Sequence, residues 1–510
     1  MNKAALRWKG NLLIPATVRA ISAYARGKRP RIRDLDAIID YLRLRIEAGL
    51  PVLPPKTAAR LQAPSKRDSL RRIEALQARK LRATVEYAYR YVPFYRQALD
   101  AAGVLPSDIR SLADISRLPL TRREQLSENA DAFISRAPGL TATTVTWTGG
   151  TTGKRIQAYL TTDEFDFYVA GEALGGLLGG LFGPSDILQI HFTMDRAIEA
   201  KILTSAARRA GALVLTYGTE GTLDDHVESI FTEWHIPGKN PKVSMLMASP
   251  SHLWALTRRA EQMGYDFSRS GLKRIVTGGA MVGEDLKRRV GETWGDILSE
   301  GYGLGEVLPC AMSQCPKSDR LHFADTTGYA EVLDQQTGEP APPGQPGILT
   351  ITTFYPDREL MPLLRYRTED LVIAAPDRWC ACGQTTTQIL DVVGRADHMV
   401  KVGSRSFYPQ EIGDALLAFP ELVRPPRFAL RTDQREDAQY VLLDAEYAAG
   451  LTADEVEALR QRICERISIS QFFLLKVGAA KLEVTLHPPG GVTHPFPYKH
   501  RYLVLAERPA

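Results

Sequence analysis

The segment at residues 146–155, TWTGGTTGKR, has the residue types of a phosphate-binding loop. Its glycines let backbone N–H groups approach phosphate oxygens closely, and its threonines add hydroxyl donors. A Walker P-loop, G-x-x-x-x-G-K-[ST], would explain Gly153 and Lys154, but it requires glycine at position 148 and a hydroxyl residue at 155. Thr148 and Arg155 stand there instead. A P-loop kinase therefore fits poorly at two positions, and a Gly/Thr hairpin without a ligand remains the structural alternative.

The segment resembles the phosphate loop of the adenylate-forming enzymes, [ST]-[SG]-G-[ST]-T-G-x, a superfamily of acyl- and aryl-CoA ligases, adenylation domains and luciferases. Four later segments are similar to further motifs of that family, in its order and approximate spacing: TGGA (277–280), EGYGLGE (300–306), RYRTED (365–370) and GRADHMVKVGSRSFYPQEI (394–412). Each string is common alone, but the ordered set is not. Residues 87–126 and CACGQT (380–385) are similar to the phenylacetate-CoA ligase branch, and the resemblance covers roughly residues 65–510.

The resemblance implies where ATP would bind. It implies that the backbone of TGGA lies beside adenine and that the tyrosine of EGYGLGE stacks on adenine. It also implies that Asp370 and Arg395 contact the ribose. Glu306 would hold Mg²⁺ between the ATP phosphates and the substrate carboxylate. The implied nucleotide-binding residues are Thr148, Gly149, Gly150, Thr151, Thr152, Gly153, Lys154, Gly278, Gly279, Ala280, Tyr302, Gly303, Asp370 and Arg395.

The resemblance also implies that a small C-terminal domain rotates between two reaction steps. Asp397 would be the hinge, and Gly403 would line the tunnel of the incoming thiol, where only glycine leaves room. The family ends in a Gly-Lys-x-x-[RK] element, which is similar to THPFPYKHRYLV (493–504) and makes Lys499 the expected adenylation lysine. The preceding glycine is absent and the arginine comes two residues later instead of three. Lys481 in AAKLEV therefore remains the competing candidate.

The function implied is ATP-dependent activation of a carboxylic acid to an acyl-adenylate, with release of pyrophosphate and then transfer to the thiol of coenzyme A. A carboxylate attacking the α-phosphate brings anion against anion, so the site must neutralise charge and hold an in-line geometry. The adenylate is itself the activated intermediate, so no protein nucleophile is needed. Two alternatives keep part of this scheme. One delivers the acyl group to the phosphopantetheine of an acyl carrier protein, and the other is a degenerate nucleotide-binding homologue.

The resemblance places the acid between the segments around His191, Met247–Ser249, Gly278–Ala280 and Tyr302–Leu304. Glycines in two of these segments leave room for a flat ring, which favours an aromatic, aryl or arylacetic acid. His191 would then meet a ring hydroxyl, or else it is a core histidine with its hydrogen bonds satisfied.

Four side chains suggest a structural zinc site. Cys380 and Cys382 resemble a zinc knuckle, and Cys315 and His322 lie upstream, directly after the Glu306 motif. Together they would make a closed Cys₃His site, which the branch resemblance implies. The spacing of one residue between the two knuckle cysteines is tighter than usual, and reduced thiols packed in a β-rich region are the alternative. Cys310 is a fallback ligand and Cys464 a core residue in this interpretation.

The surrounding sequence predicts an α/β fold that would position these motifs. Residues 66–105 show helical periodicity, and strand-like runs at 187–193, 212–218, 242–249 and 272–280 alternate with amphipathic runs such as 251–264. Alternation of this kind predicts α/β units on a largely parallel sheet. We expect a basic N-terminal extension (1–64), a large adenylate-forming domain (65–394) with a β-rich subdomain at about 320–394, and a small mobile α+β domain (395–510).

Composition limits which cellular compartments and which classes of partner are expected. The 510 residues are 44% hydrophobic and carry a mild net charge of +5, which does not argue for nucleic acid. No apolar run approaches the roughly 18 residues of a membrane span, and five cysteines fit a reducing, cytoplasmic compartment. Residues 1–33 hold nine Lys and Arg and no acidic residue. This start fits a partly helical extension packed on the body, with a transit peptide, contact with an anionic membrane or docking of an acidic carrier protein as alternatives. A homodimer is compatible with the sequence.

Overall fold

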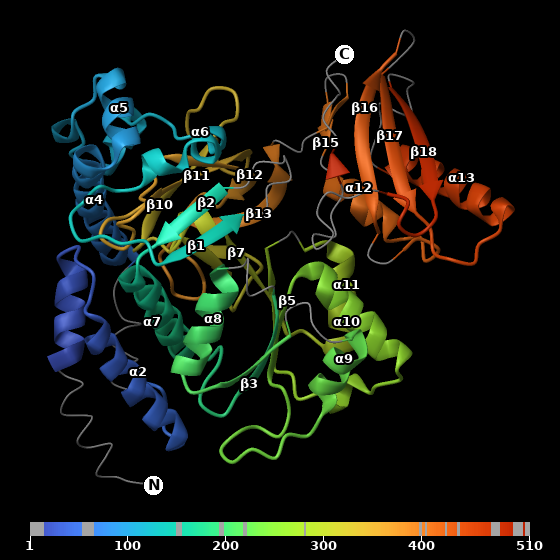
Figure 1. Ribbon diagram of the computed structural model, residues 1–510, viewed down its shortest axis with the longest axis horizontal. Helices are drawn as coiled ribbons and strands as arrows, with labels where there is room; N and C mark the ends of the chain where they lie inside the picture. The colour runs from blue at the N-terminus through green and yellow to red at the C-terminus, as the bar shows by residue number, and fades with distance from the viewer. Residues whose placement is uncertain are drawn as a thin grey trace.

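The chain forms a large α/β body followed by a smaller C-terminal α+β part, as the computed structural model shows (Figure 1). The structure describes residues 15–53, 66–148, 156–192, 198–217, 222–279, 282–396, 400–402, 405–407, 409–423, 426–435, 439–470, 480–492 and 503–504. Within these residues no helix is long and apolar enough to cross a membrane. The mixed α/β class expected from the alternating sequence pattern is confirmed.

An eleven-stranded sheet organises the large body, in the order β10-β11-β12-β13-β9-β8-β7-β6-β5-β3-β4. One half is parallel and the other antiparallel, with the change of direction between β7 and β8. The parallel strands are β3 (Ile187–His191), β4 (Leu213–Thr216), β5 (Met245–Ala248), β6 (Arg274–Gly278) and β7 (Leu298–Gly303). The antiparallel strands are β8 (Ala311–Gln314), β9 (Leu321–Phe323), β10 (Gly328–Leu333), β11 (Pro346–Thr353), β12 (Tyr366–Ala374) and β13 (Gln388–Arg395).

Helices cover both faces of the parallel half because its strands are apolar on both sides. Strand β5 shows this by alternation: Met245 and Met247 pack with α2, α7 and α8, whereas Leu246 and Ala248 pack with α9, α10 and α11. The helices are α2 (Ile32–Glu47), α4 (Lys66–Tyr91), α5 (Pro93–Ala102), α6 (Arg123–Glu128), α7 (Thr162–Gly179), α8 (Ile198–Arg209), α9 (Leu223–Phe231), α10 (Pro250–Gln262) and α11 (Glu284–Trp294). Short 3₁₀ turns are η1 (Pro106–Asp108), η2 (Leu112–Arg117), η3 (Ala130–Phe133), η4 (Phe267–Arg269) and η5 (Gly305–Val307).

The strand-like runs recognised in the sequence are β3, β4, β5 and β6, and the run at 251–264 is α10. The helical stretch at 66–105 is instead two helices, α4 and α5. Pro93 causes the break, because it has no N–H to donate to the preceding turn, and Val92 before it is extended with φ −108°.

The phosphate-loop segment is flanked by an antiparallel pair, β1 (Thr144–Thr148) and β2 (Ile156–Leu160). The segment therefore lies between two strands, whereas a Walker P-loop opens a helix. Trp147 on β1 pairs with Gln157 on β2, and its side chain is 38% exposed.

The described N-terminal residues are helical and pack on the body. Residues 15–25 form a helix before α2, and Arg19 pairs with Asp34 at 2.6 Å. Leu35, Ile39 and Leu42 of α2 are buried with residues of α7 and α8. These contacts hold the described part of the basic segment against the sheet's helical layer, although most of the cations between residues 15 and 33 are exposed.

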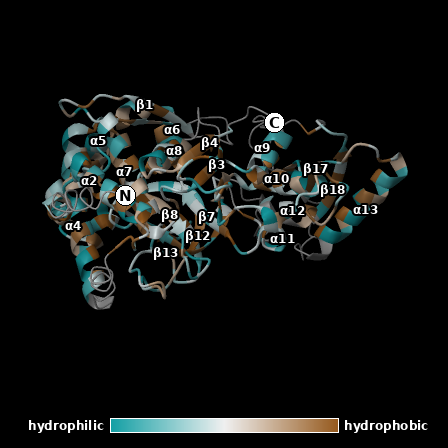
Figure 2. Ribbon diagram, turned by 90° about the horizontal axis from the view of Figure 1, so that it is seen from below, coloured by the Kyte–Doolittle hydropathy of each residue, from teal (hydrophilic) through white to brown (hydrophobic). Residues whose placement is uncertain are grey.

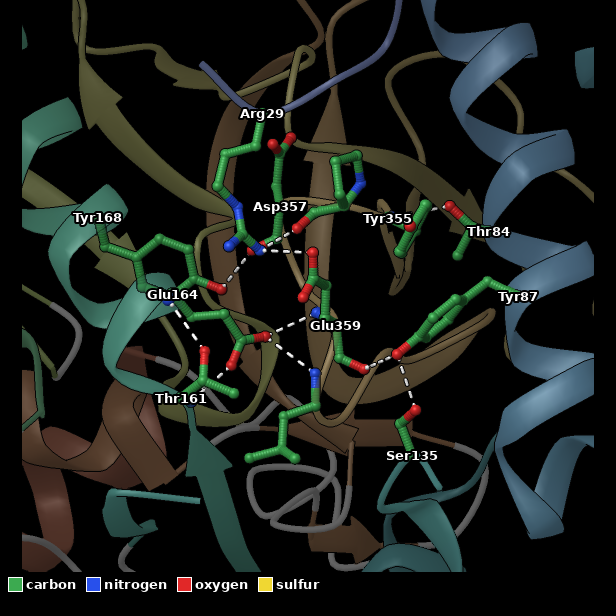
Figure 3. Close-up of polar contacts among 12 residues, drawn as sticks. Arg29, Thr84, Tyr87, Ser135, Thr161, Glu164, Tyr168, Tyr355, Asp357 and Glu359 are labelled. Atoms are coloured by element: carbon green, nitrogen blue, oxygen red, sulfur yellow. Dashed lines mark hydrogen bonds and ion pairs between the residues drawn. The ribbon is translucent and has the colours of Figure 1, made fainter. Parts of the chain in front are cut away.

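The loop after β11, residues 355–360, is bonded to α7 through its backbone N–H groups (Figure 3). Glu164, in the first turn of α7, accepts hydrogen bonds from the backbone N–H groups of Glu359 (2.6 Å) and Leu360 (3.0 Å). The same carboxylate accepts from the N–H of Thr161 at 2.8 Å and so completes a capping box. A buried glutamate therefore both starts the helix and fixes a distant loop.

The same loop holds a buried ion pair and the N-terminal segment. Lys80 on α4 lies 2.5 Å from Asp357, and both side chains are fully buried. Lys80 also donates to the carbonyl oxygen of Thr326 at 2.9 Å. Arg29 donates to the carbonyl oxygen of Pro356 and pairs with Glu359 at 3.3 Å (Figure 3).

The C-terminal part has its own sheet and its own core. Its strands follow the order β18-β17-β16-β19, and α12 and α13 pack on them. Leu459, Ile463 and Ile467 of α13 point into this core, and Figure 2 shows the helix apolar on one side and polar on the other. The elements are β14 (Val400–Val402), β15 (Arg405–Phe407), α12 (Pro409–Leu416), β16 (Phe428–Gln434), β17 (Gln439–Glu446), α13 (Ala453–Ser470), β18 (Ala480–His487) and β19 (Leu503–Val504).

Candidate active site

The expected adenine-binding backbone lies where two neighbouring parallel strands end. Gly278 ends β6 and pairs with Gly301 on β7, one residue before Tyr302. A Cβ at Gly278 would lie 2.7 Å from the carbonyl oxygen of Gly301, and Gly279 has φ +72°. Both positions therefore require glycine, the first for space and the second for conformation. Carboxyl ends of parallel strands are also where α/β sheets bind ligands.

Three residues expected to bind the nucleotide meet in one cluster. The hydroxyl of Tyr302 donates to Asp370 Oδ2 at 2.6 Å, and Arg395 Nη1 lies 3.5 Å from Asp370 Oδ1. Asp370 and Arg395 face each other in the β12–β13 register, which explains how residues from two motifs become neighbours. Burial, followed by the Asp370 carboxylate, raises the pKa of Tyr302 well above its usual value. The tyrosine is therefore a neutral hydrogen-bond donor.

Glu306 is a buried carboxylate in which only one of the two oxygens is hydrogen-bonded to described residues. Its side chain is 1% exposed, and Oε1 accepts from the hydroxyl of Tyr366 (2.9 Å) and from Arg123 Nη1 (3.2 Å). Oε2 has no hydrogen-bond partner among the residues described. A buried carboxylate oxygen without a partner is costly unless a cation or a donor completes it. A Mg²⁺ ion at this oxygen fits that requirement.

Arg123 and Tyr366 were not recognised as site residues in the sequence. Arg123 opens α6, and Tyr366 opens β12 and is fully buried. Burial, followed by the charge of Glu306, raises the pKa of Tyr366 well above its usual range, so it too is a neutral donor. The sequence could have pointed to both residues through the motifs that contain them. Tyr366 lies inside RYRTED, and Arg123 lies inside the segment 87–126 that resembles the phenylacetate-CoA ligase branch.

Two residues that flank this cluster adopt left-handed backbone. Arg365 has φ +43° and Glu369 has φ +62°, each immediately before a site residue, Tyr366 or Asp370. RYRTED resembles the motif Y-R-T-G-D of the adenylate-forming enzymes, in which glycine stands at the position of Glu369, and glycine adopts this conformation without strain. Here Glu369 holds it while pairing with Arg367 at 3.0 Å. This departure from the motif therefore keeps the backbone shape that sets the direction of Asp370.

Several expected site residues lie outside the described part of the chain, and Thr148 is described only as the last residue of β1. Those outside are Gly149, Gly150, Thr151, Thr152, Gly153, Lys154, Ala280, Asp397, Gly403 and Lys499. Lys481, the competing adenylation lysine, is on β18 with its ammonium 5.5 Å from the centre of the Tyr440 ring.

The four side chains expected to bind zinc converge. Cys315 follows β8, His322 lies on β9, and Cys380 and Cys382 lie in the loop before β13. One ligand atom of each lies within 4.8 Å of the others, with Cys315 Sγ 3.5 Å from Cys380 Sγ and Cys382 Sγ 3.4 Å from His322 Nε2. Sulfurs on one tetrahedral Zn²⁺ lie about 3.8 Å apart, given bonds of about 2.3 Å.

The surroundings of this cluster orient its histidine and shift the pKa of its thiols. His322 Nδ1 lies 2.6 Å from the hydroxyl of Thr386, which leaves Nε2 facing the cysteines. Burial raises the pKa of the Cys315 thiol, but hydrogen bonds from its surroundings outweigh burial and lower it to about 6. Burial shifts the Cys382 thiol of the same cluster the other way and raises its pKa to about 11. Cys310 lies apart from the cluster, with its thiol 3.5 Å from the carbonyl oxygen of Thr327.

His191 ends β3 and is 5% exposed. Its Nε2 lies 2.8 Å from Gln189 Nε2, whereas its Nδ1 has no hydrogen-bond partner within the described part of the protein. Burial, followed by the neighbouring His252 and His226, lowers the pKa of His191 to about 2. The interpretation of His191 as a fully satisfied core histidine is therefore correct for one ring nitrogen only.

Comparison with known proteins finds similar sequences over most of the chain. Residues 107–354 match the AMP-binding enzyme family. The phenylacetate-coenzyme A ligase of Thermus thermophilus is 28% identical over 434 residues, covering 82% of this chain and 93% of that protein. The Escherichia coli phenylacetate-coenzyme A ligase is 27% identical over 374 residues, covering 72% and 80%.

Solved structures share the fold. A 2-hydroxyisobutyryl-CoA ligase in a postadenylation state matches with a TM-score of 0.70 and 22% identity, covering 89% of this chain and 94% of that one. The same ligase in a thioesterification state gives a TM-score of 0.57, covering 88% and 91%.

Proposed function

We propose a reaction for this chain, which belongs to the AMP-binding enzyme family: it couples a carboxylic acid to ATP, forming an acyl-adenylate and pyrophosphate, and then passes the acyl group to the thiol of coenzyme A. The observation that carries the proposal is a pair of carboxylate clusters, Tyr302–Asp370–Arg395 and Arg123–Glu306–Tyr366. Each cluster takes one residue from the segment 302–306 and one from β12, so the same two segments build both. The similarity to phenylacetate-coenzyme A ligases over most of the chain supports the acid and the thiol acceptor.

The chain's own residues divide the first step between them. Asp370 accepts the ribose hydroxyls, and Tyr302 and Arg395 orient its two oxygens. The glycine backbone at 278–279 would lie beside adenine, and the close contact at Gly278 and the positive φ of Gly279 support this role. Glu306 offers Oε2 to Mg²⁺, which when bound neutralises charge between the phosphates and the attacking carboxylate. Arg123 and Tyr366 fix the other Glu306 oxygen and so keep Oε2 in place.

Residues outside the described part of the chain would take part in both steps. Lys499 would act in adenylation, the chain would bend at Asp397, and Gly403 would line the path of the thiol. The different TM-scores against two states of one ligase support a C-terminal part that changes position. Alanine substitution distinguishes Lys499 from Lys481. The variant that loses adenylation, when the other keeps it, identifies the adenylation lysine.

We further propose that the acid is aromatic, aryl or arylacetic. The test is a pyrophosphate-release screen of the full chain over aryl, arylacetic and fatty acids, each with coenzyme A, with a phosphopantetheine-loaded carrier protein, or with neither. Release with an aromatic acid, and thioester formed on coenzyme A, is expected. If thioester forms only on the carrier protein, the acceptor is the carrier's phosphopantetheine and not coenzyme A. No acid-dependent pyrophosphate release across the panel would contradict the activity and favour the degenerate alternative.

Asp370→Asn should weaken ATP use and leave the acid site intact. Hydrogen bonds to a charged group contribute about 1.5–3 kcal/mol, so the KM for ATP should rise about 10- to 100-fold while the KM for the acid stays within about threefold. Steady-state kinetics with each substrate varied in turn measures both. Asp391→Asn, which changes an exposed carboxylate on β13, is the matched control and should keep both constants. Equal rises in both KM values for Asp370→Asn would argue against a specific nucleotide contact.

We also propose that Cys315, His322, Cys380 and Cys382 bind a structural Zn²⁺, which would join the loop before β13 to β8 and β9. The convergence of three sulfurs and one oriented imidazole supports this ligand set.

Removing this zinc should loosen the large body. Chelation of the purified chain, or Cys382→Ser, should lower the thermal midpoint by roughly 5 °C or more, because the metal joins segments far apart in the chain. Elemental analysis and a thermal scan measure zinc and stability together. Cys464→Ser on α13 is the control, since this cysteine lies in the C-terminal core. An unchanged metal content and midpoint in Cys382→Ser would exclude the site.

A further inference from the structure

Three histidines from three different elements converge at the carboxyl ends of neighbouring parallel strands. His191 ends β3, His226 lies in the first turn of α9, which follows β4, and His252 lies in the first turn of α10, which follows β5. Strand β3 is hydrogen-bonded to both β4 and β5, so the three residues come to one place. None of the roles proposed above uses His226 or His252.

The spacing of the three rings matches a metal site. One ring nitrogen from each lies within 4.8 Å of the others, and the ring centres are 4.8 Å (His191–His226), 4.6 Å (His191–His252) and 5.7 Å (His226–His252) apart. With Zn–N bonds of about 2.05 Å and a ring centre about 1.1 Å beyond the nitrogen, tetrahedral geometry places ring centres about 5.2 Å apart. The observed separations lie on both sides of this value, so small ring movements complete the site.

His191 provides the second observation that indicates a ligand. Its Nδ1 is buried and has no partner in the part of the chain that the structure describes, which is costly for a polar atom that nothing completes. That atom has almost no contact with solvent, so bulk water does not complete it. The three imidazoles each offer one nitrogen within 4.8 Å of the others, a spacing that one shared cation would complete.

The surroundings hold the rings in place. Tyr217 stacks on His191 with ring centres 5.5 Å apart and contacts His226 at 4.8 Å. Gln189 Nε2 lies 2.8 Å from His191 Nε2 and donates to the carbonyl oxygen of His226 at 2.8 Å, linking the two histidines. Coordination through His191 Nδ1 leaves the ring proton on Nε2, so metal binding requires the Gln189 side chain to turn and accept a hydrogen bond from that N–H through its amide oxygen.

We propose that His191, His226 and His252 bind a divalent transition-metal ion of the zinc type. Three neutral imidazoles suit Zn²⁺, Co²⁺, Ni²⁺ or Cu²⁺ and not the oxygen-seeking Mg²⁺ or Ca²⁺. Three protein ligands leave one tetrahedral position for water or a ligand atom, at the sheet edge that also carries Gly278 and Tyr302. The site is separate from the Cys₃His cluster in ligands and in place, and it does not depend on the proposed reaction.

The test is a Co²⁺ titration of the full chain, stripped by a chelator and kept reduced. The wild-type chain should bind about two equivalents, one with thiolate-to-cobalt charge-transfer absorption and one without it. His252→Gln, at a half-buried position, should lose the second equivalent and keep the charge-transfer absorption. His235→Gln, which changes an exposed histidine of the same body, should keep both. Equal metal content in all three proteins overturns the proposal.

A second measurement on the unaltered chain guards against a variant that fails to fold. X-ray absorption of the cobalt-loaded wild type should show about one and a half sulfur neighbours per ion, the mean of a three-sulfur and an all-nitrogen site. Three sulfurs per ion with one equivalent bound would mean that only the thiolate cluster takes metal. In that case the histidines do not bind the ion, and an organic acceptor group at His191 becomes the competing assignment.

Discussion

Glu306→Gln should lower acid-dependent pyrophosphate release by about 10³-fold, which corresponds to about 4 kcal/mol of lost transition-state stabilisation. The glutamine keeps the shape, and its amide oxygen still accepts from Tyr366, so the fold should survive. The negative charge that would hold Mg²⁺ at Oε2 is lost, and Arg123 is left without its counter-charge. Initial rates of pyrophosphate release at saturating ATP and acid measure the effect.

Glu164→Gln is the matched control for this experiment. Glu164 is as deeply buried as Glu306, but it bonds backbone N–H groups at the start of α7 and in residues 359–360. Its substitution should lower the thermal midpoint and leave the rate per folded molecule within about threefold. If Glu306→Gln retains more than a tenth of the rate, Glu306 is structural and the position of the metal must be reassigned.

Lys80→Met should cost about 3–5 kcal/mol of unfolding free energy, because it leaves Asp357 buried without its partner. Replacing both members with apolar residues, Lys80→Met with Asp357→Leu, should recover most of that loss, since neither charge then needs compensation. Urea unfolding of the single and double variants measures the difference as a thermodynamic cycle.

Arg82→Met is the control on the same helix, since Arg82 is exposed two residues further along α4. Its cost should stay within about 0.5 kcal/mol. A double variant as unstable as Lys80→Met alone would mean that packing around α4, and not the unpaired charge, sets the penalty.

Local patterns in the sequence were sufficient for the strands and for part of the site. Strands β3 and β5 are short apolar runs between amphipathic helices, and such runs predict buried parallel strands without reference to distant residues. Tyr302, Asp370 and Arg395 could be named together because a family resemblance supplies the three-dimensional relation that their spacing does not contain.

The remaining contacts depend on pairings that no local pattern encodes. Arg123 and Glu306 are 183 residues apart, and Lys80 and Asp357 are 277 apart. Either arginine or lysine alone has the sequence context of a surface cation, and only the folded chain shows which carboxylate it meets. The three-histidine cluster is similar, since His191 alone gave two readings and its partners come from helices that follow other strands. The break at Pro93 was different, because the rule that predicts it is local.

The contact between Arg29 and the carbonyl oxygen of Pro356 spans 327 residues of chain, and it sets a waiting time during synthesis. At about 5–20 residues per second, Arg29 is made roughly 16–65 s before its acceptor. The partners of α2 in α7 and α8 are made earlier than that acceptor, so the apolar side of the helix can be covered first. The contact at Arg29 therefore closes the N-terminal segment onto the body only after the rest of that packing can have formed.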